Sequence, residues 1–577
     1  METRKYKKLP YGSANFETIR KEGYAYVDKT RFIELIENEP NRVLFFTRPR
    51  KFGKSLFLMM MTCYYDCCKA DIFDLLFGDL YIGKHPTPNK SNYIVFNLDF
   101  SGLNTNSEQE FKESFNRKMK SSVLSFFREH PTVPNASEIA HKLLNSNGDI
   151  GLEALDYVFQ TAENCGKKVY IIIDEYDHFA NDIIAQADDL SGTEYYHKMV
   201  GANSIVRDFY EMLKEYSKTI IDRIFITGIT PIMLDDMTSG FNISNNISIK
   251  GKYNEILGFT KEDVQFLMRE AGIDPAWIKL DMETFYNGYL FHEKGGNTVY
   301  NPSMTLYFLN EVVDLKDEYE HIIDENLKMD YGRIARLFED EQNRAQLLEI
   351  VTNGYISGGE IVSKFSLDEL RERQKFLSLL FYFGLVTIGK KDNRPILRIP
   401  NYSIKNIYWE YIEKLTLARN KKIYINTSKL SEALYLLAYE GKAKQFIEYI
   451  RRTFICDLSN RDFMQFDEKY LKIILFLNLK YANYFVPLSE YEVGAGYCDI
   501  YLMRSAPHAD LPCEWVWEIK YIRQKDADNP EVIEKKCEQA RKQLAKYRNS
   551  AFFRNRKDVR FLSAVFIGKK KVEIEEI

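Results

Sequence analysis

The first 255 residues alternate short apolar runs with segments of helical periodicity. The clearest apolar runs have the length of a strand and cover residues 43–46, 93–98, 169–173 and 223–227. Strands that alternate with helices are typical of a parallel sheet with helices on both of its faces. We therefore predict an α/β core over residues 1–255.

Three further patterns follow the core. Residues 256–330 are largely helical, and Thr260 with Asp263 predicts a capped helix start, so we expect a helical lid here. Residues 331–415 carry helices and then two short strands around a turn, which is typical of a winged-helix-like module. Residues 416–577 mix strands with a long helix and form a fourth predicted domain. The length of 577 residues suits this number of domains.

The strand at 43–46 leads into a run that ends in Gly-Lys-Ser and continues as a helix. This order builds a phosphate cradle from backbone N–H groups at a helix N-terminus. We predict that Lys54 reaches the β- and γ-phosphates and that Ser55 holds Mg²⁺. Arg48 stands where the usual pattern has glycine. The other predicted nucleotide contacts are Arg50, Phe52, Gly53 and Leu56.

Two carboxylates end the buried strand at 169–173, where ligands sit in α/β sheets. We expect Asp174 to belong to the Mg²⁺ shell and Glu175 to orient and deprotonate the attacking water. Thr227 ends another strand and could touch the γ-phosphate or that water, with Thr230 as its alternative. A threonine that merely ends a strand is an equally good interpretation.

A second group of polar residues lies near the C-terminus. Glu518 and Lys520 are two positions apart on a predicted strand and share a face, and Asp499 on the preceding strand can converge on them. Asp499, Glu518 and the Ile519 carbonyl predict a Mg²⁺ site, with Lys520 positioning or deprotonating a water. The chemistry indicated is phosphodiester hydrolysis. An exposed ion pair is the alternative for Glu518 and Lys520.

A basic stretch overlaps the next predicted helix. Between Lys535 and Lys571 the sequence has thirteen Lys and Arg residues against two acidic residues. Four-residue spacing places Gln539, Gln543 and Tyr547 on one helix face. We predict that Gln543 and Tyr547 contact nucleic acid, while a solvated helix face is the alternative.

Composition narrows the class of protein. The net charge is −4, and no apolar run approaches the roughly 20 residues that span a bilayer. With no apolar signal-peptide core near the start, we expect a soluble cytoplasmic protein without a membrane partner. The eight cysteines lack a Cys-x-x-Cys pair or accompanying histidine spacing, which argues against a zinc site. We expect Cys63, Cys67 and Cys68 to pack on the helix after the phosphate loop.

Four segments, residues 26–30, 48–56, 257–260 and 300–302, resemble the bacterial predicted AAA-ATPase-like family. Chains of that family typically end in a PD-(D/E)XK nuclease-superfamily domain. The resemblance implies an AAA-like P-loop NTPase sheet, a restriction-endonuclease-like C-terminal domain, and ATP and Mg²⁺ as cofactors. It places the nucleotide on Gly53, Lys54, Ser55, Asp174 and Glu175, and the nuclease-like site on Asp499, Glu518 and Lys520.

The resemblance also bears on individual positions. The resemblance implies that arginine at position 48 is the family's own variant at this loop position. It also makes Glu490 or Glu492 a further candidate acidic residue of the nuclease-like site. Gln543 with Tyr547 resembles the Gln-x-x-x-Tyr helix of exonuclease-like relatives. Tyr497 departs from the pattern, because many members have arginine there, and Lys51 replaces an arginine.

Three functional hypotheses follow. The leading one is an ATPase fused to a Mg²⁺-dependent DNA nuclease whose access is gated by the nucleotide state. The second is a nucleotide-dependent switch or scaffold whose C-terminal domain binds nucleic acid or protein without cutting. The third is an interaction protein in which both sites have decayed. Homo-oligomerisation is left open, and the candidate arginine fingers are Arg48, Arg50 and Arg223.

Overall fold

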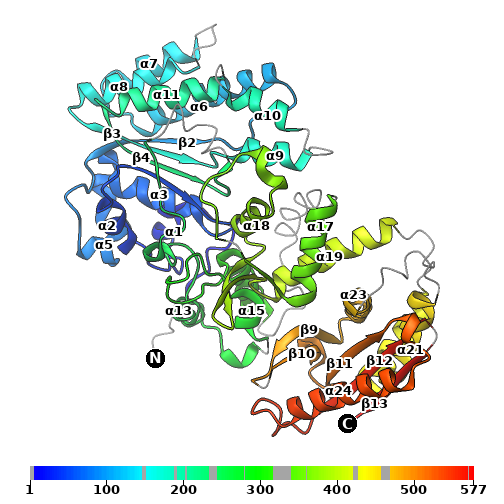
Figure 1. The fold of residues 1–577 in the computed structure, drawn as a ribbon. Helices are drawn as coiled ribbons and strands as arrows, with labels where there is room; N and C mark the ends of the chain where they lie inside the picture. The colour runs from blue at the N-terminus through cyan, green and yellow to red at the C-terminus, as the bar shows by residue number, and fades with distance from the viewer. Residues whose placement is uncertain are drawn as a thin grey trace, which may run out of the picture. The chain divides into compact units, whose positions relative to one another are not determined.

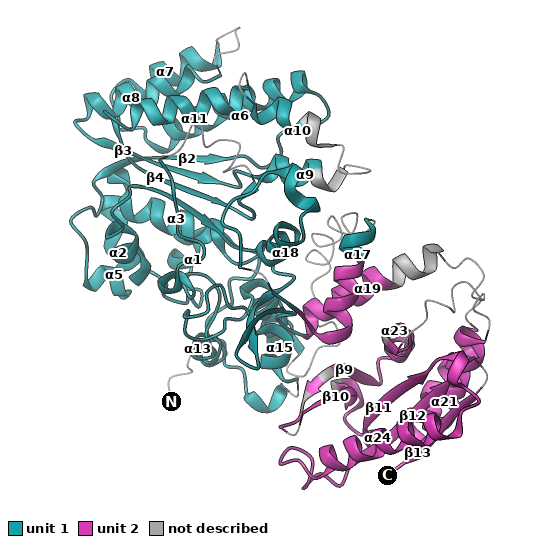
Figure 2. Cartoon of the chain, viewed as in Figure 1, with its two compact units in different colours: residues 1–344, 357–401 teal, residues 345–356, 402–577 magenta. Residues whose placement is uncertain are grey.

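The computed structural model divides the chain into two compact units (Figure 2). Unit 1 comprises residues 1–344 and 357–401, and unit 2 comprises residues 345–356 and 402–577. The predicted division into four domains is finer than these two units and stays a prediction. The structure describes residues 6–145, 151–186, 192–201, 204–232, 243–278, 280–315, 340–358, 360–419, 426–456, 468–494, 496–569 and 571–577.

Unit 1 is built on a five-stranded sheet in the order β2-β3-β4-β1-β5, in which all neighbouring strands are parallel. β4 lies between β1 and β3, so the ends of these three strands meet at one edge of the sheet. The strands are β1 (Val43–Thr47), β2 (Tyr93–Asp99), β3 (Lys168–Asp174), β4 (Ile221–Gly228) and β5 (Asn245–Asn246).

Helices cover both faces of this sheet, because its central strands are apolar and buried on both sides. Figure 1 shows α6, α8 and α11 on one face and α1 and α3 on the other. Before the lid, the helices are α1 (Phe16–Lys21), α2 (Arg31–Glu37), α3 (Lys54–Tyr65), α4 (Phe73–Phe77), α5 (Tyr81–Lys84), α6 (Glu108–Glu129), α7 (Ala136–Leu144), α8 (Ala154–Asn164), α9 (His178–Gln186), α10 (Gly192–Val200) and α11 (Ile205–Tyr216).

The predicted lid segment is helical, with α13 (Lys261–Ala271), α14 (Met282–Tyr286) and α15 (Pro302–Leu315). The Thr260 side chain accepts a hydrogen bond from the Asp263 backbone N–H, and Asp263 accepts one from the Thr260 N–H. This reciprocal pair is the predicted capping box. It fixes where α13 begins.

The segment after the lid contains the predicted helix and hairpin. α18 (Arg373–Tyr382) precedes the antiparallel strands β7 (Thr387–Lys391) and β8 (Arg394–Arg398). A positive φ at Asp392 and Asn393, 49° and 60°, closes the two-residue turn between the strands. α17 (Glu341–Asn353) and the short strand β6 (Tyr355–Ser357) come before α18 in the chain.

Unit 2 contains a five-stranded mixed sheet in the order β13-β12-β11-β10-β9. β11 and β12 are parallel and their outer neighbours are antiparallel, because α24 connects β11 to β12 as a crossover. The strands are β9 (Phe485–Glu492), β10 (Tyr497–Arg504), β11 (Glu514–Ile522), β12 (Val559–Ile567) and β13 (Lys571–Glu576). The helices are α19 (Tyr402–Arg419), α20 (Thr427–Glu440), α21 (Ala443–Ile450), α23 (Glu468–Leu479) and α24 (Pro530–Arg548).

The predicted α/β multidomain class is confirmed by these two sheets with their helices. One detail is corrected: α3 ends at Tyr65, so only Cys63 lies on it, and Cys67 and Cys68 lie on the following 3-10 helix η1 (Cys67–Ile72). Within the described part of the chain, no helix has both the length and the apolar character needed to cross a membrane.

Candidate functional site

The phosphate loop of unit 1 joins β1 to α3. Gly53 has φ 91°, in the left-handed region that favours glycine, and α3 begins at the next residue. Lys51 has φ 63°, so the loop turns twice through left-handed conformations before the helix. These turns present the N-terminus of a 12-residue helix at the edge of the sheet. Such a helix end binds anions through its free N–H groups and its dipole.

The Lys54 ammonium is held inside this loop. Lys54 Nζ donates to the Arg48 carbonyl at 3.0 Å and to the Pro49 carbonyl at 3.1 Å. Lys54 is buried, and this burial lowers the pKa of its ammonium. Its two carbonyl partners are weak acceptors compared with an anion, so a phosphate oxygen is a better partner for the same charge.

Asp174 connects several of the predicted nucleotide residues. Its Oδ2 accepts a hydrogen bond from Ser55 Oγ at 2.6 Å, and its Oδ1 accepts one from Thr227 Oγ1, also at 2.6 Å. The Glu175 N–H donates to Oδ1 at 2.9 Å. The serine hydroxyl and carboxylate thus sit side by side, which is the pair that holds Mg²⁺ in P-loop NTPases.

Glu175 follows Asp174 in a strained conformation, with φ 49° at a residue that is not glycine. Burial raises the pKa of its carboxyl group. His178 Nε2 lies 3.7 Å from Glu175 Oε2, and its Nδ1 lies 3.2 Å from Asp182 Oδ2. Sequence reasoning missed His178. Its spacing of three residues from Glu175, at the start of α9, was the available signal.

A cavity of about 710 Å³ opens in front of the phosphate loop. This volume is in the range of small-molecule sites. Its lining joins three parts of unit 1: residues 50–57 with Glu175 and His178, the N-terminal segments 10–14 and 25–29, and lid residues from Leu257–Phe259 and Pro302–Leu306. Residues 26–30 carry part of the family resemblance, but no residue of the N-terminal segments was predicted to line the nucleotide site.

Arg48 has a structural role in this loop. Its guanidinium donates to the carbonyls of Thr47, Ser248 and Tyr253, and it packs 4.0 Å from the centre of the Phe291 ring. Only 1% of Arg48 is exposed, and this burial lowers its pKa to about 9. The hypothesis that Arg48 is an arginine finger is wrong, since its charge is enclosed.

The other two candidate fingers differ from each other. Arg223 is buried near the start of β4, where it donates to the Glu37 carbonyl, so it lies at the opposite end of the strand from Thr227. That position also excludes Arg223. Arg50 lines the cavity and stays the candidate.

Aromatic residues support the loop from behind. Phe52 is buried, with its ring centre 4.9 Å from that of Tyr289 and 5.6 Å from that of Phe291. Phe291 lies 6.0 Å from Phe381 on α18. A Cβ atom at Gly384 would come within 2.8 Å of the Pro49 ring, so glycine permits this close approach. The loop therefore packs against both the lid segment and the segment containing α18.

The C-terminal acidic residues come together in unit 2. Lys520 Nζ lies 2.6 Å from Glu518 Oε1 and 3.7 Å from Asp499 Oδ2. The same Asp499 oxygen accepts a hydrogen bond from the Ile519 N–H at 2.8 Å. The pairing of Ile500 with Trp517 across β10 and β11 sets this geometry. The three predicted residues thus converge on one point.

Two residues of α23 complete this cluster and were missed. Lys472 Nζ lies 2.6 Å from Asp499 Oδ1, and Glu468 Oε1 lies 4.0 Å from Lys520 Nζ. Glu468 and Lys472 are four residues apart and therefore share one helix face. That spacing was the available signal, but nothing in the sequence places α23 against β10 and β11.

The electrostatics of this cluster are unbalanced. Three carboxylates, Asp499, Glu518 and Glu468, face two ammonium groups, Lys472 and Lys520. Glu518 Oε2 is buried and has no hydrogen-bond partner among the described residues, and burial with the neighbouring Asp499 raises the pKa of Glu518 to about 8. Burial lowers the pKa of Lys520, but Asp499 and Glu518 outweigh it, and the net direction is upward. A divalent cation would relieve this imbalance.

The predicted nucleic-acid contacts have partners within the unit. Tyr547 is buried on α24 and its hydroxyl donates to the Tyr497 carbonyl at 2.7 Å. Gln543 is half-buried on the same helix. Their contact with nucleic acid stays a prediction. Glu490 and Glu492 lie on β9, and their side chains fall outside the described part of the structure.

The basic stretch is partly neutralised by ion pairs. Arg556 pairs with Glu514, Arg560 with Glu576, and Arg541 with Glu534 and Glu575. Seven cationic residues of the stretch are exposed among the described residues: Lys535, Lys542, Lys546, Arg548, Arg554, Lys557 and Lys571. Two of these, Lys542 and Lys571, also form ion pairs, with Glu538 and Glu573. The count of thirteen basic residues therefore overstates the positive field of this surface.

Two family models match the two parts of the chain that hold the candidate sites. Residues 10–238 match the family model described as predicted AAA-ATPase, and residues 466–576 match that of the PD-(D/E)XK nuclease superfamily. An Azotobacter chroococcum mcd 1 protein, described as an uncharacterized protein in the vnfD 5' region, is 25% identical over 455 residues, 77% of each chain. The solved Aeropyrum pernix ORC2 protein (ADPNP-ADP complexes) has 11% identity and a TM-score of 0.23, with 72% of this chain and 97% of that chain covered.

The phosphate loop, Asp174 and the cavity lie within or beside the first match, and Asp499, Glu518 and Lys520 lie within the second. The two matches confirm the suspected layout: this chain joins a predicted AAA-ATPase-like domain to a PD-(D/E)XK nuclease-superfamily domain.

Proposed function

We propose that this protein binds and hydrolyses ATP and cuts DNA with Mg²⁺, and that its nucleotide state controls the cutting. The observation that carries the nuclease half is Glu518 Oε2, which is buried among Asp499, Lys520 and Lys472 and has no hydrogen-bond partner in the described part of the chain. A buried carboxylate oxygen without a donor is costly, and a cation is the partner that its charge demands.

The residues of the C-terminal cluster fit a divalent cation. Asp499 and Glu518 supply hard oxygen ligands on adjacent strands. A bound Mg²⁺ would offset the charge that develops on the phosphate oxygens and lower the pKa of a water. Lys520 would hold the attacking water, and Lys472 would fix the orientation of Asp499 through its 2.6 Å ion pair.

The residues of unit 1 fit a nucleoside triphosphate with Mg²⁺. Lys54 would exchange its two loop carbonyls for phosphate oxygens, and Ser55 and Asp174 would hold the cation. Glu175 would take a proton from the attacking water, a role that its raised pKa favours because the carboxyl group then binds a proton more readily. Thr227 would orient that water or the γ-phosphate.

The proposed control of DNA cutting by the nucleotide depends on the residues that pack against the phosphate loop. Phe52 and Pro49 pack against Tyr289 and Gly384, and the chain runs from this region through Asn401 directly into α19 of unit 2. A change in the loop on nucleotide binding would therefore act on the segment that leads into the nuclease-like unit.

A nucleotide-dependent switch that binds without cutting is the second candidate. Tyr497, which is 38% exposed, stands where the family resemblance implies arginine, and the Tyr547 hydroxyl donates to a backbone carbonyl. These two observations remove donors that could hold a substrate phosphate. If the wild-type protein does not cut DNA, these observations favour the switch.

The deciding experiment incubates the purified full chain with linear and circular double-stranded DNA, Mg²⁺ and ATP. We expect cleavage by the wild type and its loss in Glu518→Ala and Lys520→Ala. Glu573→Ala serves as the matched control, because Glu573 pairs with Lys571 in an exposed contact on β13 of the same sheet. Cleavage that persists in both site variants would contradict the nuclease assignment, and its absence in the wild type would favour the switch.

A further inference from the structure

A second cluster of ligand-type side chains lies in unit 1, outside the nucleotide site. Asp66 follows α3 and pairs with Tyr93 at the start of β2, Cys68 lies on η1, and His130 caps the end of α6. α3 begins at the phosphate loop and ends at this cluster, and its 12 residues span about 18 Å. The cluster is therefore at the opposite end of the sheet from Lys54 and Asp174.

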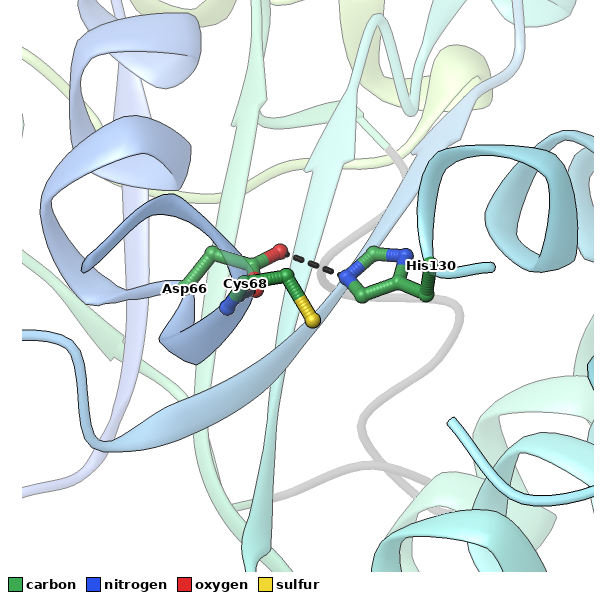
Figure 3. Close-up of side chains that lie close together, drawn as sticks. All are labelled: Asp66, Cys68 and His130. Carbon is green, nitrogen blue, oxygen red and sulfur yellow. Dashed lines mark hydrogen bonds and ion pairs between the residues drawn. The ribbon is translucent and has the colours of Figure 1, made fainter. Parts of the chain in front are cut away.

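The side chains of this cluster point toward one another (Figure 3). An Asp66 carboxylate oxygen, Cys68 Sγ and a His130 ring nitrogen all lie within 4.8 Å of one another. Asp66 and His130 are 1% and 3% exposed, and Cys68 opens toward the surface. The ligand set is thus built from a rigid buried pair and a reachable thiol.

The orientation of His130 indicates that a positive charge belongs between it and Asp66. His130 Nδ1 lies 2.8 Å from the Phe126 carbonyl, which accepts only from a protonated nitrogen, so Nδ1 carries a hydrogen. In the neutral ring Nε2 then has a lone pair, and it lies 2.7 Å from Asp66 Oδ2, another acceptor. Two acceptors at this distance need a proton or a metal ion between them. The carbonyl contact of Nδ1 is also the usual support of a metal-bound histidine.

The cluster supplies three ligand atoms, one each from Asp66, Cys68 and His130. A tetrahedral ion bound there would take a water as its fourth ligand. Ligand atoms of a tetrahedral Zn²⁺ site are about 3.3–3.8 Å apart, given bonds of about 2.0–2.3 Å. The spacings here, from 2.7 Å to within 4.8 Å, bracket that range and need only small side-chain shifts.

We propose that Asp66, Cys68 and His130 form a Zn²⁺ site, with a water as the fourth ligand. Nitrogen and sulfur ligands with one carboxylate select Zn²⁺ over the Mg²⁺ expected at the two phosphate-handling sites. The ion joins the segment after α3 to the end of α6, so its role is structural or regulatory. This proposal departs from the expectation that the cysteines form no zinc site, because His130 is 62 positions beyond Cys68 and no sequence spacing signals it.

The test titrates Co²⁺ into the purified full chain, which has first been treated with a chelator and kept under a thiol-free reductant. We expect one equivalent to produce a thiolate-to-cobalt charge-transfer band that Zn²⁺ then abolishes. Cobalt bound by the carboxylates at Asp174 or Asp499 gives no such band, because the band requires a metal–sulfur bond. The other two sites therefore cannot imitate the result.

Variants assign the band to this cluster. Cys68→Ala should remove the band, His130→Gln should weaken cobalt binding at least tenfold, and Cys63→Ala should leave both unchanged. Cys63 is the matched control, since it is a buried thiol on the adjoining α3 that belongs to no such cluster among the described residues. The amide N–H of a glutamine at position 130 can still donate to Asp66, so this variant tests ligation in a folded protein.

Two results would overturn the proposal. One is a wild-type chain that binds Co²⁺ without a charge-transfer band. The other is a band that survives in Cys68→Ala with its intensity unchanged. In either case the pair of Asp66 and His130 is an ion pair that holds a proton and no metal.

Discussion

The two candidate sites of this chain satisfy their charges in different ways. In unit 1 the polar groups of the nucleotide site bond one another: Lys54 donates to two loop carbonyls, and Asp174 accepts from Ser55, Thr227 and the Glu175 N–H. Within the described residues of unit 2, Glu518 Oε2 is buried without a donor, and three carboxylates face two lysines. The polar groups of the first site thus satisfy one another by hydrogen bonds, and those of the second site do not.

This difference indicates how each site would respond to its ligand. The unit 1 site would exchange existing hydrogen bonds for bonds to a nucleotide, so binding involves a rearrangement of bonds that the site already makes. The unit 2 site would gain a partner that it lacks, so a cation would stabilise the unit directly. Ligand binding raises stability in proportion to its preference for the folded state. The following predictions test this contrast.

The largest effect is expected for Glu175→Gln. The change keeps the shape of the side chain and removes its ability to accept a proton, so ATP turnover should fall by roughly 10²–10⁴-fold. Nucleotide affinity should stay within a few-fold, because the phosphate partners Lys54 and Ser55 are intact. Phosphate release and fluorescent-nucleotide binding measure the two quantities. Equal losses in both would instead give Glu175 a binding role.

Lys54→Ala should have the next largest effect. A hydrogen bond to a charged group contributes about 1.5–3 kcal/mol, so loss of the contacts to two phosphates should weaken nucleotide binding by roughly 10²–10⁴-fold. Titration calorimetry with a non-hydrolysable ATP analogue measures this loss. Lys252→Ala is the control, since Lys252 pairs with Glu39 away from the cavity. An unchanged affinity would contradict the proposal that Lys54 exchanges its loop carbonyls for phosphate oxygens.

The unbalanced site predicts a pH effect in metal-free protein. Because the pKa of Glu518 is raised to about 8, the folded state holds a proton that the unfolded state releases near 4.5. Stability from this group is present at low pH and is lost as the pH rises toward and through about 8. Thermal unfolding with a chelator should therefore show a falling Tm over this range, by about 2–4 °C for each kcal/mol lost.

Glu518→Gln is the matched variant for this measurement, since the amide has a similar shape and does not titrate. Its Tm should fall less over the same range than that of the wild type. Added Mn²⁺ should raise the Tm of the wild type at high pH and leave that of the variant nearly unchanged. If the Tm of the two proteins changed equally with pH, the predicted charge imbalance at Glu518 would be contradicted.

The smallest effect is expected at the lid. Thr260→Ala removes the side-chain acceptor at the start of α13 and should cost about 1 kcal/mol of local stability. Gly258 and Phe259 line the cavity just before this cap, so nucleotide affinity should fall a few-fold while turnover of bound ATP is unchanged. Thr284→Ala, a surface hydroxyl that bonds Asp281, is the control. An affinity loss equal to that of Lys54→Ala would mean that the lid governs binding.

Much of the fold could be predicted from local pattern. The apolar runs at 43–46, 93–98, 169–173 and 223–227 became β1 to β4 within one or two residues at each end, because buried parallel strands need continuous apolar sequence. The convergence of Asp499, Glu518 and Lys520 was also predictable, since alternate residues of a strand share a face.

Other features had no local signal. Glu468 and Lys472 lie more than twenty-five residues before Asp499 in the chain, and only the packing of α23 brings them to it. Arg48 looked like a possible catalytic group, but three backbone carbonyls and two aromatic rings enclose it. His130 reaches Asp66 from the far end of α6. Each of these depends on contacts between elements that the sequence does not order in space.

The sequence alone determined which residues carry the chemistry that lies along single elements: the Gly-Lys-Ser loop, the acidic end of β3, and the Glu-x-Lys face of β11. Backbone geometry fixes the spacing within a loop or strand, so these patterns have the same meaning in any fold. Tertiary structure decided which groups share a charge, which are enclosed and which are left without a partner. Those properties arise from burial and from distances between separate elements, and both exist only in the packed protein.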